Sequence, residues 1–236
     1  MEDKKLILYD LRSAETKCWS PNLWKVRLAL RYKGIPFETV WLTYPDIKPT
    51  IGQHCQQGEE APTLPTIQHG DVWVYDSWSI IQYLEKTFPS TPSLLYPNLE
   101  TNHFFLTFYT QLLWASARPK LLPLSAEILD VRGKEYFVRT RRARFGMSLE
   151  EMGRGRSVLD WKKELDVVVK QITSTGKYIF GHQLSYADIL VLSLLLWMVK
   201  VDPGLVEQTL EMYTGKEGEA FRGWYERVRV IAKEDL

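Results

Sequence analysis

In the first part of the chain, short apolar runs alternate with segments in which apolar residues recur with helical periodicity. A short apolar run between turn-forming residues predicts a strand, and apolar residues recurring every three to four positions predict a helix. The first two strands flank a whole helix and are therefore expected to be parallel, whereas a tight turn at Gly70 joins the next two as a hairpin. In chain order we expect a strand at 6–10, a helix at 21–32, a strand at 36–42, a loop at 44–58 with at most a short helix near 47–53, strands at 61–68 and 72–75, and a helix at 78–88.

The second part of the chain has helical periodicity only. A proline-dense segment precedes it, which is typical of a linker. We therefore predict two domains, an α/β domain over 1–88 and an all-helical domain over 102–236, joined by a linker at 89–101. The helices expected in the second domain are 102–117, 121–130, 135–145, 158–173, 186–199, 205–213 and 219–232.

The helix at 186–199 has the clearest start signal. Ser185 can cap its first turn and Asp188 can return a bond three residues on, which is the pattern of a capping box, while Leu184 can pack on Ile189. The helix is apolar on nearly every side. Because such a helix must be covered all round, we expect it at the centre of the second domain.

Composition places the chain among ordinary globular proteins. It has 236 residues, 45% of them hydrophobic, and a net charge of +1, which gives no argument for nucleic-acid binding. The basic cluster at 139–144 lies in a charged helical segment. It is interpreted as a solvated helix face, with a phosphate or partner contact as the alternative.

The cysteines, the first residues and the apolar stretches indicate the compartment of the protein and whether it binds a metal or a membrane. Cys18 and Cys55 are too few for a disulfide framework and lack metal-ligand spacing, so we expect no metal and a reducing compartment. The first residues contain no apolar signal region, and the longest apolar stretch, 189–199, is too short to span a bilayer. We expect a cytoplasmic protein without a membrane partner.

A helix start at Ser20-Pro21 follows the first strand. Serine is a favoured N-cap and proline suits the first helical position. The start of a helix concentrates free N–H groups and partial positive charge, an environment that stabilises a thiolate, a carboxylate or a phosphate. A serine before a helix proline is also an ordinary cap, and this stretch by itself is consistent with both roles.

Taken together, four local features resemble the cytosolic glutathione transferases, whose fold is a thioredoxin-like N-terminal domain followed by an all-α C-terminal domain. Within that superfamily, 19–25, 33–37 and 41–46 look most like the fungal-specific class A, a serine-type class related to bacterial β-etherases. Cys18 lies two residues too early to act as the cysteine of an omega-class member. The four features are Ser20-Pro21 at the first helix start, Leu64-Pro65 where the family has a cis-proline, Asp76-Ser77 before the third helix, and the Ser185–Asp188 capping box.

The resemblance implies a glutathione site and assigns its residues. Ser20 would donate a hydrogen bond to the sulfur of glutathione and stabilise the thiolate, with the helix end adding its positive charge. Leu64 would pair its backbone with the extended tripeptide. The other residues expected to bind glutathione are Asn22, Pro65, Asp76 and Ser77, and Lys48 and Gln53 are candidates for the glycyl carboxylate.

The resemblance also implies an electrophile pocket between the domains. Aromatic side chains suit such a pocket, but their helical spacing fits a buried core equally well. The expected reaction is conjugation of glutathione to small hydrophobic or aromatic electrophiles, or peroxide reduction. A non-catalytic, ligandin-like binder of aromatic molecules and a glutathione-dependent β-etherase are the alternatives, and a homodimer is expected. The residues assigned to the pocket are Trp19, Trp24, Phe105 and Tyr109.

Overall fold

The computed structural model describes residues 5–54 and 63–232, and its first domain is built on a four-stranded mixed sheet. The strand order is β2-β1-β3-β4; β1 and β2 are parallel, and β3 is antiparallel to both its neighbours. The predicted β-α-β unit and hairpin are confirmed, although the third strand begins only after the cis peptide bond between Leu64 and Pro65. The strands are β1 (Leu6–Leu11), β2 (Phe37–Leu42), β3 (Thr66–His69) and β4 (Val72–Tyr75).

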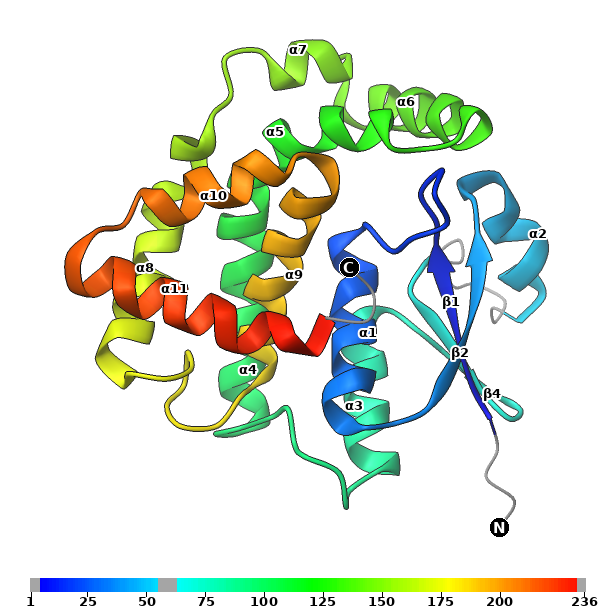
Figure 1. Ribbon diagram of the computed structural model, residues 1–236. Helices are drawn as coiled ribbons and strands as arrows, with labels where there is room; N and C mark the ends of the chain where they lie inside the picture. Colours follow the sequence, from blue (N-terminus) through cyan, green and yellow to red (C-terminus); the bar gives the residue numbers. More distant parts are fainter. Residues whose placement is uncertain (1–4, 55–62, 233–236) are drawn as a thin grey trace.

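Three helices cover the two faces of this sheet. Helices α1 (Pro21–Lys33) and α3 (Ser77–Thr87) lie on the face toward the second domain, and α2 (Ile47–Ile51) lies on the other (Figure 1). Short turns η1 (Tyr44–Asp46) and η2 (Gly52–His54) flank α2. Helix α1 is buried along most of its length because it is packed between the sheet and the second domain.

The second domain consists of helices throughout the described residues. Its first helical run is continuous from Leu99 to Glu127, where a break had been expected after residue 117. The elements are α4 (Leu99–Phe108), η3 (Tyr109–Leu113), α5 (Trp114–Glu127), α6 (Val131–Phe145), α7 (Leu149–Gly153), η4 (Val158–Trp161), α8 (Lys162–Thr175), α9 (Tyr186–Val201), α10 (Pro203–Glu211), α11 (Gly215–Arg229) and η5 (Val230–Ala232).

Helix α5 has no break near residue 117 and runs on through Pro119 and Pro123. Proline in a helix interior removes a hydrogen bond and normally kinks or ends the helix. Here α7, an element that the sequence pattern did not predict, packs on these prolines. A Cβ atom at Gly153 would lie 3.0 Å from Pro123 Cγ and 3.8 Å from the Pro119 carbonyl oxygen, so α7 packs closely on this part of α5.

Helix α9 is the centre of the second domain, as its apolar sequence predicts. Every residue from 186 to 198 is buried, and α9 packs against α1 of the first domain (Figure 1). The Asp188 carboxylate accepts hydrogen bonds from the Ser185 N–H and hydroxyl, both at 2.9 Å, as expected of a capping box. Among the described residues, no helix combines the length and apolar character needed to cross a membrane.

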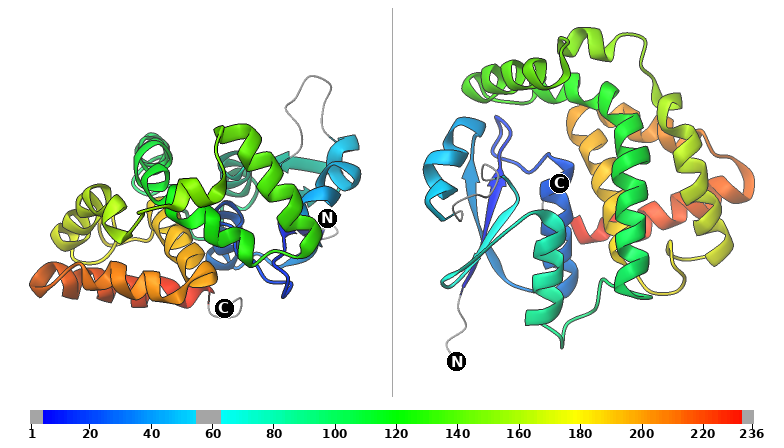
Figure 2. Two further views of the ribbon diagram at one scale, coloured as in Figure 1. Left: turned by 90° about the horizontal axis from the view of Figure 1, so that it is seen from above. Right: turned by 180° about the vertical axis from the view of Figure 1, so that it is seen from behind.

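A second contact joins the domains at α6, which lies over the first domain in the view from above (Figure 2). Tyr44 of η1 stacks on Tyr136 with ring centroids 5.7 Å apart, and the Arg141 guanidinium lies 4.3 Å from the centre of the Phe137 ring. Tyr44 also accepts a hydrogen bond of 3.3 Å from Arg141. The two domains are thus held together by α1 against α9 and by η1 against α6.

Candidate functional site

A cavity of about 460 Å³ lies where four segments meet: the start of α1, the turn before β3, the start of α3 and the α4–η3 junction. All five residues predicted to bind glutathione line it, although they come from separate segments of the sequence. The lining also includes five residues that the sequence reasoning missed. The complete lining is Asn22, Lys25, Thr63, Leu64, Pro65, Asp76, Ser77, Trp78, Leu106 and Thr110.

Ser20 is the N-cap residue of α1, with an extended backbone (φ −72°, ψ 134°). Its carbonyl oxygen accepts the N–H groups of Leu23 and Trp24 at 3.1 and 3.0 Å, but its side chain makes no capping hydrogen bond. Ser20 is half-buried and stands two residues before Asn22, which lines the cavity; Ser20 itself does not belong to the lining. Ser20 therefore occupies the N-cap position without using its hydroxyl for capping.

The N-cap of α3 is Asp76. The Asp76 Oδ1 atom accepts the N–H groups of Trp78 and Ser79 at 2.9 and 3.1 Å, and Ser77 is the first helical residue. Asp76 has φ +67°, in the region that residues other than glycine rarely adopt and that costs on the order of 1–3 kcal/mol. Such conformations cluster at ligand-binding sites.

Lys25 is the cavity residue with the most unusual environment. It is 5% exposed, and its ammonium group donates a hydrogen bond of 2.9 Å to Asn22 Oδ1 and lies 5.0 Å from the centre of the Tyr109 ring. Burial lowers the pKa of Lys25 to about 8, an effect that the negative charge of Asp76 partly opposes. The signal in the sequence was its spacing from Asn22, because residues three apart lie on one face of a helix.

The prediction that Trp24 and Tyr109 line the electrophile pocket is wrong. Both side chains are fully buried and belong to the hydrophobic core, so neither offers a surface to a substrate. The Tyr109 hydroxyl lies 3.4 Å from Ser193 Oγ of α9. These rings face the junction of α1 with the second domain, and periodicity alone did not predict which side of each helix that junction would cover.

Trp19 and Phe105, the other residues assigned to the pocket, lie apart from the cavity lining. Trp19 is 2% exposed, packs edge-on against Phe137 and borders a separate hollow of about 280 Å³. Phe105 is half-buried against Phe108 and Phe180. The residues that represent the second domain in the cavity are instead Leu106 and Thr110.

Other candidate residues also lie outside this cavity. Lys48 and Gln53 do not line it. Cys18 is buried, and Cys55 lies outside the described residues. Within residues 5–54 and 63–232, no group of three or more His, Cys, Asp and Glu side chains is arranged to hold a metal ion.

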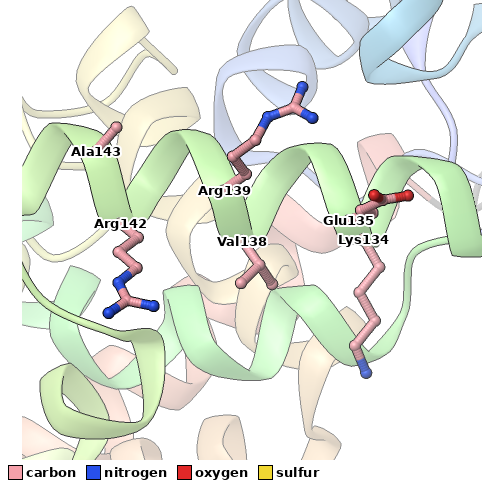
Figure 3. A pocket seen from close by; sticks show the side chains of 6 residues that line it. All are labelled: Lys134, Glu135, Val138, Arg139, Arg142 and Ala143. Atoms are coloured by element: carbon pink, nitrogen blue, oxygen red, sulfur yellow. The ribbon is translucent and has the colours of Figure 1, made fainter.

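A hollow of about 660 Å³ on α6 contains part of the basic cluster and has a different character. Its lining comes from α6 alone, and Arg139 and Arg142 point to opposite sides of the helix (Figure 3). Both are exposed, as expected of a solvated face. Because the two guanidinium groups do not converge, the hollow is not a built anion site. The lining residues are Lys134, Glu135, Val138, Arg139, Arg142 and Ala143.

Family models match both domains of the chain. Residues 16–92 match the model described as "Glutathione S-transferase, N-terminal domain", and residues 101–224 match the "Glutathione S-transferase, C-terminal domain". The chain belongs to the glutathione S-transferase family. A curated relative, the glutathione S-transferase-like protein ustS of Aspergillus flavus, is 31% identical over 245 residues, covering 91% of this chain and 88% of that protein.

Solved glutathione transferases of fungi share the whole fold. The glutathione transferase GSTFuA3 from Phanerochaete chrysosporium is 27% identical with a TM-score of 0.82, covering 96% of this chain and 97% of that one. CsGST63524 of Ceriporiopsis subvermispora, solved in complex with glutathione, is 28% identical with a TM-score of 0.81 and covers 98% of both chains. The resemblance predicted from the sequence is thereby confirmed, as is the thioredoxin-like first domain with an all-helical second domain.

Proposed function

We propose that the protein is a serine-type glutathione transferase that binds glutathione in the 460 Å³ cavity at the start of α1. The observation that carries this proposal is the meeting of Asn22, Leu64, Pro65, Asp76 and Ser77 in that cavity. The glutathione complex of the relative CsGST63524 supports the choice of ligand.

Ser20 activates the thiol in this proposal. A free thiol with a pKa near 8.5 is only a few per cent ionised at neutral pH, so the site must stabilise the thiolate. Lowering the thiol pKa by about two units takes about 2.7 kcal/mol. A hydrogen bond from the Ser20 hydroxyl to the thiolate, about 1.5–3 kcal/mol, and the start of α1, about 0.3–1 kcal/mol, are together sufficient.

The thiolate then attacks a small hydrophobic or aromatic electrophile, or reduces a peroxide. In conjugation the sulfur forms a bond to the electrophilic carbon, and the leaving group departs with the bonding electrons. The electrophile approaches from the second domain, where Leu106 and Thr110 border the cavity. Leu106 and Thr110 thus take the place of Trp24 and Tyr109 as pocket residues, because the side chains of Trp24 and Tyr109 are fully buried in the core.

Ser20→Ala is the variant that tests the role of the hydroxyl. We expect it to bind glutathione with nearly unchanged affinity and to lose about 10- to 100-fold in kcat/KM with an aromatic electrophile, which corresponds to about 1.5–3 kcal/mol. Calorimetry gives the affinity and steady-state kinetics give the activity.

Ser148→Ala is the matched control, because Ser148 caps α7 far along the chain and its hydroxyl accepts the Glu151 N–H. It should leave kcat/KM unchanged. Full activity in Ser20→Ala would contradict the serine mechanism. A parent protein that binds glutathione and never turns over a panel of electrophiles would instead identify a ligandin-like binder.

We also propose that the enzyme is a homodimer, as the family resemblance implies. Phe104 on α4 supports this proposal, since 77% of its surface is exposed. It follows His103, whose ring stacks on Trp78 of the glutathione cavity at 5.5 Å. Aromatic side chains are enriched at the contact surfaces between protein chains.

A further inference from the structure

Lys25 is a buried cation for which the serine mechanism has no role. An ammonium group has three N–H donors, and burial is costly when they lack partners. Here one donor is taken up by Asn22 Oδ1, and the ring of Tyr109 lies beneath the charge. Lys25 forms no ion pair with any described residue. A buried cation that lines a cavity in this way is suited to an anionic ligand group.

The start of α3 needs such a cation if it is to hold a carboxylate. Helix starts attract anions through their free N–H groups, but at α3 the Asp76 carboxylate already accepts those of Trp78 and Ser79. A second carboxylate arriving at Ser77 therefore meets the negative charge of Asp76. Lys25 lines the same cavity and is close enough to Asp76 for their charges to interact.

We propose that the Lys25 ammonium group binds the α-carboxylate of the γ-glutamyl end of glutathione, an inference that rests on the proposed function. That end of the peptide carries a carboxylate and an ammonium group on one carbon. Lys25 and Asp76 offer the opposite charges in the same cavity. Ser77 completes the carboxylate site with its hydroxyl and N–H.

The thiolate is another anionic group of bound glutathione, and the cavity lining favours the carboxylate as the partner of Lys25. Lys25 lines the cavity together with Asp76 and Ser77, whereas Ser20 does not belong to its lining. Asn22, three residues before Lys25, lies on its face and is bonded to it. Helices α1 and α3 pack against each other, which brings this face toward Asp76 and Ser77.

The test compares Lys25→Met with the parent in binding two peptides, glutathione and the analogue whose γ-glutamyl residue is replaced by 4-aminobutyrate and therefore lacks the α-carboxylate. Calorimetry on the parent should show a preference for glutathione of about 10- to 100-fold, and Lys25→Met should reduce that preference to about threefold or less. Lys25→Arg keeps the cation and should restore most of it. An undiminished preference in Lys25→Met overturns the inference.

S-methylglutathione separates the carboxylate from the thiolate, because its thioether cannot ionise. Lys25→Met should weaken the binding of glutathione and of S-methylglutathione by the same factor. A loss confined to glutathione would place Lys25 at the sulfur and overturn the inference. Lys86→Met, at an exposed lysine near the other end of α3, is the control and should bind all three peptides like the parent.

Failure of the proposed function gives a different result from failure of this inference. If the parent binds none of the peptides, the glutathione site itself is wrong and the role of Lys25 fails with it. If the parent binds glutathione but shows no coupling between Lys25 and the α-carboxylate, only the inference fails. Retained binding of the 4-aminobutyryl analogue by Lys25→Met shows that the variant is folded.

Discussion

Lys25 costs the folded protein stability, because burial disfavours its charged form. Its pKa falls from 10.5 to about 8, with burial as the main cause and the charge of Asp76 acting in the opposite direction. Since one pKa unit corresponds to 1.36 kcal/mol, the cost is about 3 kcal/mol at neutral pH. The folded state binds fewer protons than the unfolded state between pH 8 and 10.5, so this cost is full below pH 8 and fades as the pH rises through that window.

Lys25→Met is therefore expected to stabilise the ligand-free protein while weakening glutathione binding. At pH 7 its free energy of unfolding in urea should exceed that of the parent by about 1–3 kcal/mol, since an apolar side chain of similar length removes the buried charge. The gain should shrink when the measurement is repeated near pH 10. A variant less stable than the parent at pH 7 would show that Lys25 is needed for folding.

Arg27 and Asp10 form a second buried charged group with a different role. The Arg27 Nε and Nη2 atoms donate to Asp10 Oδ2 at 3.0 and 2.7 Å, and Nη2 also donates to Thr39 Oγ1 at 3.0 Å. Burial raises the pKa of Asp10 to about 6, although Arg27 acts to lower it. The pair ties α1 to β1, and the bond of Arg27 to Thr39 adds β2.

Arg27→Met should destabilise the protein by about 3–5 kcal/mol at pH 8, because it leaves the Asp10 carboxylate buried without its partner. The pKa of Asp10 then rises further above its unfolded value of 3.8, so the folded variant binds the extra proton. Its stability must therefore increase as the pH falls, and the loss measured by urea denaturation should be smaller at pH 5 than at pH 8. An equal loss at both pH values would contradict this account of Asp10.

At the scale of helices and strands, the sequence was most informative where a local signal defines an element's start or end. Pro21 at the start of α1 and the Ser185–Asp188 capping box both have local causes, and the sequence predicted them. The residues assigned to glutathione that line the cavity stand at such boundaries too, for example Asn22 and Ser77 in the first turns of α1 and α3.

The elements and residues that the sequence did not predict depend on packing between distant segments. Helix α5 continues through Pro119 and Pro123 because α7 covers them, and nothing local reveals that contact. The same limit applies within the site. Lys25 was missed and Trp24 was misassigned because helical periodicity does not tell which face of α1 meets the cavity and which meets α9.

At the scale of the whole molecule, the cavity combines groups from both domains. The first domain supplies most of the lining, and the second supplies Leu106 and Thr110. The packing of α9 on α1 and the stacking of Tyr44 on Tyr136 hold these parts together. The position of the second domain over the cavity thus depends on contacts outside it.

The proposed dimer makes a prediction at this scale. Phe104→Glu places a charge where we expect an apolar contact between subunits, and it should shift the protein from dimer to monomer in light scattering. Val131→Glu is the matched control, because Val131 is 84% exposed at the start of α6, and it should leave the dimer intact. A monomeric parent, or a Phe104→Glu variant that remains dimeric, would contradict the proposed surface.

In the proposed function, the start of α1 and the Ser20 hydroxyl ionise the thiol of bound glutathione. The most direct test of this ionisation is a pH titration of the thiolate absorbance of the glutathione complex, for the parent and for Ser20→Ala. The account predicts a thiol pKa about two units below 8.5 in the parent complex and about one to two units higher in Ser20→Ala than in the parent, at similar affinity. A bound thiol that titrates like free glutathione in the parent, or identically in both proteins, would contradict it.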